Sequence, residues 1–243
     1  MTRFFVDRDT FLSETPRLTG ENGKHAAVLR LKAGEPVILC DGAGRERLCR
    51  VLSCMPGETA VAAEPIRPAV TEPRVWVSVY MAYPKADKLE HVIQKATELG
   101  AGEIVAFPSA RCVSRLEEKS LGKKLERWQK IAQSAAEQSG RGRIPRVVLL
   151  KSWKEALNRA AGADRAILFY EHEAACTLSS ALAAGNYASV SLLTGPEGGL
   201  EEREVEEART AGITVCTLGS RILRCETAPL CALSAVMYAS GEF

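Results

Sequence analysis

The sequence predicts an α/β protein with a mainly parallel sheet, preceded by a smaller β-rich region. From residue 74 onward, short apolar runs alternate with segments whose apolar residues recur at helical spacing, which is typical of a parallel sheet. Before residue 65, short apolar runs follow one another across close turns, which is typical of a small β-barrel. Between the two regions, residues 65–74 hold three prolines, so we expect a stiff linker there. The predicted domains are therefore 1–70 and 71–243.

The N-terminal region contains four candidate strands, at residues 3–6, 36–40, 45–53 and 59–64. The dipeptide Asp41-Gly42 lies between the second and the third of them. Asp-Gly between two apolar runs is a strong signal of a β-hairpin, because glycine tolerates the turn conformation. We therefore expect an antiparallel pair at the centre of this domain.

The C-terminal region contains six candidate strands, at residues 75–81, 103–107, 146–150, 166–170, 190–193 and 213–218. Helical spacing of apolar residues predicts helices at 85–99, 117–139, 153–160 and 228–240, the last with Thr227 as its cap and Pro229 in its first turn. We expect the strands 190–193 and 213–218 to be neighbours in the sheet. Their following loops would then lie side by side at the carboxyl ends of the strands, where α/β sheets bind ligands.

Composition and charge limit the class of protein. Apolar residues make up 46% and charged residues 26% of the 243 residues, as in ordinary globular proteins. No apolar run is long enough to span a membrane and the N-terminus does not resemble a signal peptide, so we expect a cytoplasmic protein without a membrane partner. The net charge is only +2, but residues 111–154 contain twelve Lys or Arg against four Glu. This local excess favours a nucleic-acid partner over a merely solvated helix face.

The chain has eight cysteines, none in a CxxC motif, and three scattered histidines. This pattern predicts no metal site, and it fits a reducing compartment in which cysteines serve as small apolar residues.

The loop 195–199 reads GPEGG, and its three glycines would let a ligand approach the backbone closely. A plain strand-to-helix turn remains the alternative. A phosphate site fits poorly, because no Gly-Lys-Ser or Gly-Lys-Thr is present and Glu197 would face the phosphates. An uncharged or cationic ligand, such as S-adenosylmethionine, suits this loop better.

The second loop, 218–227, reads LGSRILRCET and places Arg224 and Glu226 beside apolar residues. These two side chains either act on a substrate or form an internal ion pair. Cys225 is disfavoured as a nucleophile because no histidine lies near it in the sequence. In the glycine-rich loop after the long helix, Arg141 and Arg143 suit either phosphate contacts or capping of the helix.

Four motifs in this order resemble the RsmE family of SPOUT-class 16S ribosomal RNA (uracil-N3) methyltransferases. They are KATELG at 95–100, EQSGR at 137–141, GPEGG at 195–199 and LGSRILRCETAP at 218–229. The similarity extends to RFFV near the N-terminus and to the HAAVLR and CDG segments that follow. One departure is Cys225, where the family usually has threonine.

The resemblance implies a PUA-like N-terminal barrel that binds RNA and a C-terminal SPOUT domain with a trefoil knot. It implies a homodimer whose active site lies near the subunit interface, with the last helix as a candidate for that interface. The implied reaction is transfer of a methyl group from S-adenosylmethionine to N3 of a uridine in 16S rRNA of the small ribosomal subunit. An rRNA-binding assembly factor that has lost catalysis is the alternative. A dinucleotide-dependent oxidoreductase is disfavoured because the GxGxxG motif is missing.

The resemblance also assigns roles to individual residues. Arg224 is expected to stabilise negative charge on the uracil, with Glu226 as base or orienting partner. The expected RNA contacts are Arg3, Lys24, Arg111, Arg141 and Arg143. The expected cofactor contacts are Phe169, Tyr170, Leu193, Thr194, Gly195, Pro196, Glu197, Gly198, Gly199, Leu218, Gly219, Ile222, Leu223, Arg224 and Thr227.

Overall fold

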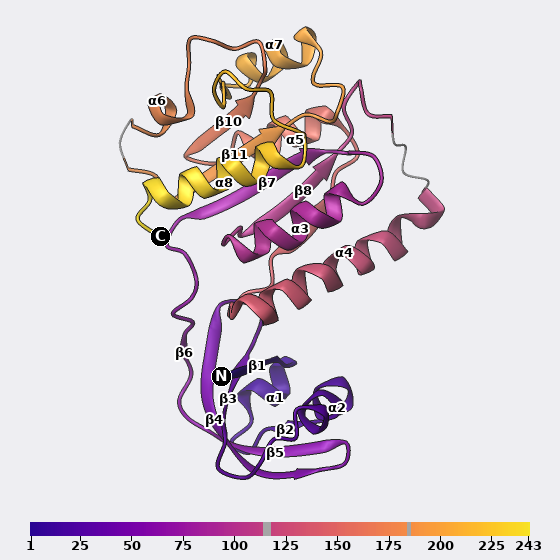
Figure 1. Cartoon of the computed structure of the whole chain (residues 1–243), viewed down its shortest axis with the longest axis vertical. Coiled ribbons are helices and arrows are strands. Elements are labelled where there is room, and N and C mark those ends of the chain that lie inside the picture. The colour runs from indigo at the N-terminus through magenta and orange to yellow at the C-terminus, as the bar shows by residue number, and fades with distance from the viewer. Residues whose placement is uncertain (114–117, 184–185) are drawn as a thin grey trace. The chain divides into compact units, whose positions relative to one another are not determined.

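The computed structural model describes residues 1–113, 118–183 and 186–243, which form two compact units (Figure 1). The first unit comprises Met1–Glu72 and Ala136–Ile144, and the second comprises Pro73–Ala135 and Pro145–Phe243. The predicted division at residue 70 differs mainly in that the segment 136–144, the end of the long helix and the loop after it, belongs to the first unit.

The first unit is a curled six-stranded sheet with two short helices. Its strands run in the order β1-β3-β4-β5-β2, and β6 pairs with β4. Their bounds are β1 (Thr2–Phe5), β2 (Arg17–Leu18), β3 (Pro36–Cys40), β4 (Arg45–Met55), β5 (Glu58–Ala63) and β6 (Arg67–Pro68). The predicted hairpin is confirmed, because β3 and β4 are antiparallel and Gly42 has the positive φ of 73° that a turn glycine supplies.

The helices α1 (Arg8–Leu12) and α2 (Gly20–Val28) of this unit were not predicted. Only Gly23 and Ala26 are buried on α2, so no periodic run of large apolar residues marks it in the sequence. Gly23 lies so close to the turn after β4 that a Cβ at this position would come within 2.3 Å of the Gly57 carbonyl oxygen. The helix is therefore held by close backbone packing rather than by large side chains.

The segment 65–74, expected to be a stiff linker, is extended at β6 and is paired there with the first unit. Arg67 and Pro68 pair in antiparallel register with Glu46 and Arg45 of β4. A proline has no N–H to donate, so it is tolerated in a strand of this kind at the edge of a sheet.

The second unit contains a six-stranded sheet in the order β12-β10-β11-β7-β8-β9, with every pair parallel. This confirms the predicted parallel sheet. The bounds are β7 (Trp76–Ala82), β8 (Glu103–Phe107), β9 (Arg146–Leu149), β10 (Arg165–Phe169), β11 (Ser189–Thr194) and β12 (Thr214–Cys216). The expectation that the last two strands are neighbours is wrong, because β10 lies between β11 and β12. All three strands still end at the same edge of the sheet, since they are parallel.

Helices cover both faces of this sheet. Their bounds are α3 (Lys88–Glu98), α4 (Glu118–Ser139), α5 (Trp153–Ala160), α6 (Leu178–Leu182), α7 (Glu202–Thr210) and α8 (Thr227–Ala239). Residue 117, where the long helix was expected to begin, lies outside the described residues. On one face, buried residues of α5 and α7 form a core with Tyr80, Leu168 and Leu193 of the strands.

The last helix packs on the middle of the sheet, although the strand before it lies at the edge. α8 contacts β7, β11 and α3, and Figure 1 shows α8 and α3 in front of these strands. The chain therefore returns from edge strand β12 to the centre of the sheet, and the trefoil knot stays a prediction. Thr227 is the first residue of α8 rather than its cap, and Glu226 occupies the cap position. The helix begins there because the Arg224 carbonyl already accepts the Thr227 and Ala228 N–H groups.

Among the helices of the described residues, none is long and apolar enough to cross a membrane.

Candidate active site

A cavity of about 640 Å³ opens at the carboxyl ends of β10, β11 and β12. Its walls come from the loop after Phe169, the loop after Thr194 and the loop after Cys216, and Lys88 at the start of α3 adds a further wall. The volume lies in the range of small-molecule sites, which is about 300–1,000 Å³. The site therefore forms where the edge of a parallel sheet is expected to bind a ligand.

Most of the expected cofactor contacts line this cavity. They are Phe169, Tyr170, Thr194, Gly195, Pro196, Glu197, Gly199, Leu218, Gly219, Ile222, Leu223 and Arg224. Leu193, Gly198 and Thr227 are not part of its lining: Leu193 is completely buried in the core and Thr227 lies in α8. The expected contacts of these residues with a cofactor stay a prediction.

The glycines of the loop 195–199 allow close packing within the protein. Gly199 has a φ of 69°, and a Cβ on it would come within 2.4 Å of the Glu171 carboxylate. A Cβ on Gly195 would lie 3.0 Å from Cγ of Leu200. The glycine pattern therefore reflects the tight turn of this loop against its own neighbours as well as any approach of a ligand.

Lys88 joins the two loops that the sequence singled out. Its Nζ lies 3.1 Å from Oε1 of Glu197 and 3.2 Å from Oε2 of Glu226, and it also approaches Sγ of Cys225 at 3.7 Å. Among the described residues, no ion pair joins Arg224 to Glu226. The internal ion pair considered for this loop therefore exists, but its cation is Lys88 and the Arg224 side chain is exposed.

The network keeps both carboxylates ionised. Burial alone would raise the pKa of Glu197, but the N–H of Lys85 at 2.9 Å and the Lys88 ammonium lower it below its ordinary value. Burial likewise opposes the ionised form of Glu226, yet hydrogen bonds from its own N–H and the Cys225 thiol, together with Lys88, lower the pKa of this carboxyl. The hydrogen bonds to Glu197 and Glu226 raise the pKa of Lys88. The three groups thus carry one net negative charge.

Cys225 is not suited to nucleophilic attack. Burial, followed by the hydrogen bond to Glu226, raises the pKa of its thiol to about 12. The thiol donates to Oε2 of Glu226 at 3.2 Å and stays protonated at neutral pH. This agrees with the preference against a catalytic cysteine drawn from the sequence.

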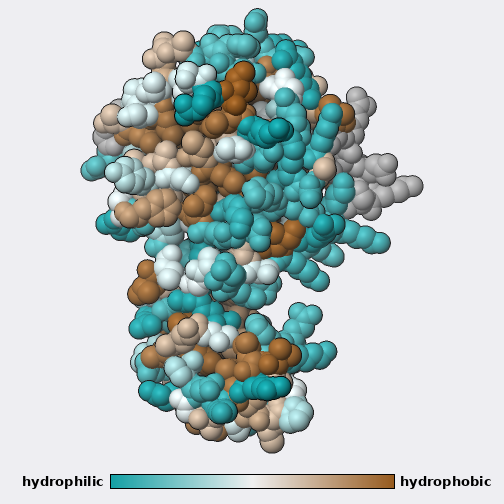
Figure 2. Space-filling view, in the orientation of Figure 1, coloured by the Kyte–Doolittle hydropathy of each residue, from teal (hydrophilic) through white to brown (hydrophobic). Residues whose placement is uncertain are grey.

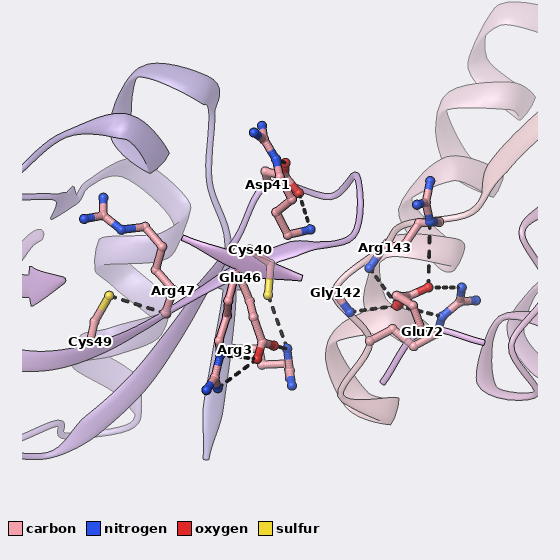
Figure 3. Close-up of polar contacts among 12 residues, drawn as sticks. Arg3, Cys40, Asp41, Glu46, Arg47, Cys49, Glu72, Gly142 and Arg143 are labelled. Carbon is pink, nitrogen blue, oxygen red and sulfur yellow. Dashed lines mark hydrogen bonds and ion pairs between the residues drawn. The ribbon is translucent and has the colours of Figure 1, made fainter. Parts of the chain in front are cut away.

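Two of the arginines expected to contact RNA are held in ion pairs in the first unit (Figure 3). Nη1 of Arg3 lies 2.6 Å from the fully buried Glu46. Nη2 of Arg141 lies 2.7 Å from Oε2 of Glu72, which also lies 3.8 Å from Nε of Arg143, and only 3% of Arg141 is exposed. Oε1 of Glu72 accepts the N–H groups of the loop after α4. These pairs give Arg3 and Arg141 a structural role, and their contact with RNA stays a prediction.

The remaining candidates for RNA contact are more accessible. Lys24 is exposed on α2, and the Arg143 side chain is partly exposed. In the second unit, Arg111 is exposed and donates from Nη1 to the Gly198 carbonyl oxygen at 3.1 Å. Arg111 is therefore the one of the five that lies beside the glycine-rich loop of the cavity.

The sequence did not point to Lys88, because its partners lie more than 100 residues away along the chain. The acidic residues Glu171 and Glu173 lie shortly after the predicted strand 166–170 and line the cavity, but they were not named individually among the expected contacts. Their position after a strand of the parallel sheet was the signal that could have found them. Within the described ranges, no cluster of three His, Cys, Asp or Glu residues is arranged to hold a metal ion.

Comparison with known proteins defines the class of this molecule. Residues 71–237 match the RNA methyltransferase domain family, and residues 18–54 match the RNA methyltransferase PUA domain. The fold is thus that of an RNA methyltransferase of the SPOUT class with a PUA domain. Over 98% of the chain, the sequence is 39% identical to the ribosomal RNA small subunit methyltransferase E of Bacillus subtilis, 96% of which is covered. The chain belongs to the ribosomal RNA small subunit methyltransferase E family, which confirms the resemblance drawn from its motifs.

Solved structures agree with this assignment. The chain superposes with a TM-score of 0.86 and 31% identity on a ribosomal RNA small subunit methyltransferase E from Neisseria gonorrhoeae bound to S-adenosylmethionine, covering 98% of this chain and 97% of that one. A methyltransferase from Legionella pneumophila in complex with the same cofactor is 26% identical with a TM-score of 0.83, over 98% and 97% of the two chains. The predicted fold class is confirmed.

Proposed function

We propose that this protein transfers the methyl group of S-adenosylmethionine to N3 of a uridine in 16S rRNA of the small ribosomal subunit. The observation that carries the proposal is the cavity at the carboxyl ends of β10, β11 and β12, in which Lys88 pairs with Glu197 of the glycine-rich loop. Because the substrate is ribosomal RNA, we place the protein in the cytoplasm. We assign no metal to the reaction.

The residues of the cavity fit S-adenosylmethionine. The lining holds three carboxylates, on Glu171, Glu173 and Glu197, which attract a positive sulfonium, while Lys88, Arg221 and Arg224 balance their formal charge. Apolar side chains such as Phe169, Leu218 and Ile222 line the same cavity and suit adenosine. When bound, the cofactor supplies an electrophilic methyl group, and the chain supplies binding and charge.

The target nitrogen determines what the protein residues must do. N3 of uracil lies on the Watson–Crick edge, so the base must be unpaired before it reaches the cavity. The N3 proton must leave, and the negative charge on the ring must be stabilised as the new bond forms. Arg224 lines the cavity with an exposed guanidinium, and we assign it to this stabilisation.

The network favours an orienting role for Glu226 over the role of general base. A general base works best with a pKa near the operating pH, whereas the pKa of Glu226 is lowered below its ordinary value. Its carboxylate is instead occupied by the Lys88 ammonium and the Cys225 thiol. We therefore assign Lys88 and Glu226 as positioning residues that link the start of α3 to the start of α8.

We also propose that the protein is a homodimer in which the face around α8 is the interface. Tyr238, near the end of α8, is 75% exposed, and Trp76, at the start of β7, is 41% exposed. Figure 2 shows apolar side chains among the hydrophilic ones on the face of the second unit that carries α8. Exposed apolar side chains of this kind are typical of protein interfaces.

The activity is tested with small ribosomal subunits isolated from a strain that lacks this protein. Incubation with the protein and methyl-labelled S-adenosylmethionine is expected to put label on N3 of one uridine, detected by mass spectrometry of nuclease digests of 16S rRNA. Binding to the subunit without incorporation of label would support the alternative, a catalytically inactive assembly factor. Titration with NAD serves as a ligand control and is expected to produce no binding heat.

S-adenosylmethionine is expected to bind more weakly as the pH falls and Glu197 and Glu226 become protonated. Replacement of Lys88 by methionine is expected to raise the pH at which this acid limb of the binding profile begins by about one unit. The pKa values of Glu197 and Glu226 are lowered in the native protein, so both carboxylates stay ionised well into the acid range. Without the ammonium their pKa values rise, and the carboxylates that attract the sulfonium become protonated earlier as the pH falls. The dissociation constant is measured by calorimetry from pH 5 to 8.

Lys88→Arg keeps the charge and is expected to retain most of the native profile. Arg203→Met removes a cation from an exposed helix ion pair with Glu207 and serves as the matched control. An acid limb that is the same in Lys88→Met and in the native protein would show that Lys88 does not set the ionisation of the site.

A further inference from the structure

Two cysteines that do not line the cavity meet beside residues that do, and the proposed reaction uses neither. Cys216 is the last residue of β12, and Cys176 lies two residues before α6. Their sulfur atoms are 3.1 Å apart, and both thiols are free. Of the eight cysteines, all of which the structure describes, these two form the sulfur–sulfur contact within hydrogen-bonding range.

The backbone holds these cysteines in register. Thr177 and Thr217 form a parallel bridge, and the Thr217 N–H donates to the Cys176 carbonyl oxygen at 2.8 Å. The cysteines directly precede the bridged threonines, so they are neighbours across two parallel segments. Such segments lie about 4.8 Å apart, and Cα atoms about 4.4–6.8 Å apart can be joined by a disulfide. The bond therefore requires only a small movement of the two sulfurs.

The two thiols differ in access to solvent. Cys216 is completely buried, whereas Cys176 is partly exposed. A reagent from solution therefore meets Cys176 first. Burial, with the hydrogen bond to Cys176, raises the pKa of Cys216 to about 12, so Cys216 is a slow resolving thiol whose attack depends on its sulfur lying 3.1 Å from that of Cys176.

We propose that Cys176 and Cys216 are a site of reversible disulfide formation by exchange with a low-molecular-weight disulfide. In the first step, Cys176 attacks the reagent, forms a mixed disulfide and releases one thiol, which takes up the Cys176 proton. In the second step, Cys216 displaces the remaining half of the reagent from Cys176, and that half leaves as a second thiol with the Cys216 proton. The protein pair is oxidised and the reagent disulfide is reduced to two thiols.

The bond would join two walls of the cavity. Each cysteine is close in sequence to residues that line the cavity. Glu173 and Ala174 precede Cys176, and Thr217 and Leu218 follow Cys216. The closed loop spans about 40 residues, so the bond restricts the unfolded chain substantially. The disulfide is thus a covalent link across the ligand site, and it does not depend on which ligand binds there.

The test uses the full chain with an excess of oxidised glutathione, followed by trapping of free thiols with an alkylating agent. Before alkylation, we expect an intact mass about 2 Da lower with no retained glutathione. After alkylation, we expect the oxidised pair to carry no alkyl group and the peptide map to join the segments around Cys176 and Cys216. The melting temperature is expected to rise by roughly 5 °C, as for a disulfide that closes a loop of this size. Dithiothreitol is expected to reverse both changes.

Cys176→Ser is expected to abolish the mass change and the thermal shift. Cys231→Ser removes an exposed cysteine and is expected to behave as the native protein does. A stable glutathione adduct on Cys176, a bond in which Cys231 takes part, or an unchanged melting temperature after oxidation would overturn the proposal. Each of these readouts is independent of methyl transfer, so failure of the proposed activity would not be mistaken for failure of this site.

Discussion

Arg224→Ala is expected to lower the rate of methyl transfer by roughly 100-fold or more, because removal of one preorganised group that stabilises transition-state charge has this size of effect. Arg224 lines the cavity with an exposed side chain that takes part in no ion pair within the described part of the chain. Its loss therefore removes a cation from the site without breaking a structural contact. The turnover number with undermethylated small subunits is the measurement.

The melting temperature and the dissociation constant of S-adenosylmethionine separate this role from a structural one. Both are expected to stay close to the native values in Arg224→Ala, since exposed substitutions usually change stability by less than about 0.5 kcal/mol. Arg224→Lys keeps the charge but loses the planar fork, so a partial rescue would assign part of the effect to charge. Arg203→Ala on α7 is the control for loss of an exposed arginine. Near-native turnover of Arg224→Ala would remove Arg224 from the mechanism.

Glu46→Gln is expected to destabilise the first unit by about 3 kcal/mol, since loss of one partner of a buried ion pair leaves an uncompensated charge. Glu46 is completely buried and accepts from Arg3 at 2.6 Å and from Arg67 at 2.9 Å, which ties β1 and β6 to β4 (Figure 3). The Arg3 side chain is only 8% exposed and would lose its charged partner inside the sheet. Hydrogen exchange of the β1, β3 and β4 amides in the full chain measures the loss.

Glu58→Gln is the matched control in the same unit. Glu58 pairs with Arg17, but both side chains are exposed, so this pair contributes little to stability. Exchange rates in Glu58→Gln are expected to match those of the native protein. Equal changes in exchange rate in Glu46→Gln and Glu58→Gln would show that the buried ion pair contributes no more to stability than the exposed one. Amides of the second unit report whether the effect stays local.

Strands and helices were predicted correctly where large buried residues form a continuous run or recur at helical spacing along the element. The run EIVAF is buried at every position of β8, and WKEALNRA repeats buried residues at helical spacing in α5, and both elements have the predicted bounds. α2 was missed because its buried residues are small, and β6 was missed because its pairing partner is distant in sequence. Elements defined by local periodicity can therefore be predicted, whereas elements held by packing from elsewhere cannot.

The same distinction applies to the candidate site, of which some features could be predicted from the sequence and others could not. The loops after β11 and β12 were found from their glycines and charges, because loops after parallel strands meet at one edge of the sheet. The sequence did not predict that β10 lies between these strands. It also did not predict the ion pair of the buried Arg141 with Glu72 or that of Lys88 with Glu226. No local pattern specifies which of many charged residues become partners.

By itself, the sequence determined the α/β class, the six strands of the parallel sheet, the family of the chain and the two loops that line the cavity. These features follow from hydrophobic periodicity and from motifs that are contiguous in the chain. Only the tertiary structure decided that β10 separates β11 from β12, that Lys88 pairs with Glu197 and Glu226, and that Arg3 and Arg141 are held in ion pairs. The physical reason is that ion pairs and burial depend on distances in space, and partners can lie far apart in the sequence, as Lys88 and Glu226 do at a separation of 138 residues.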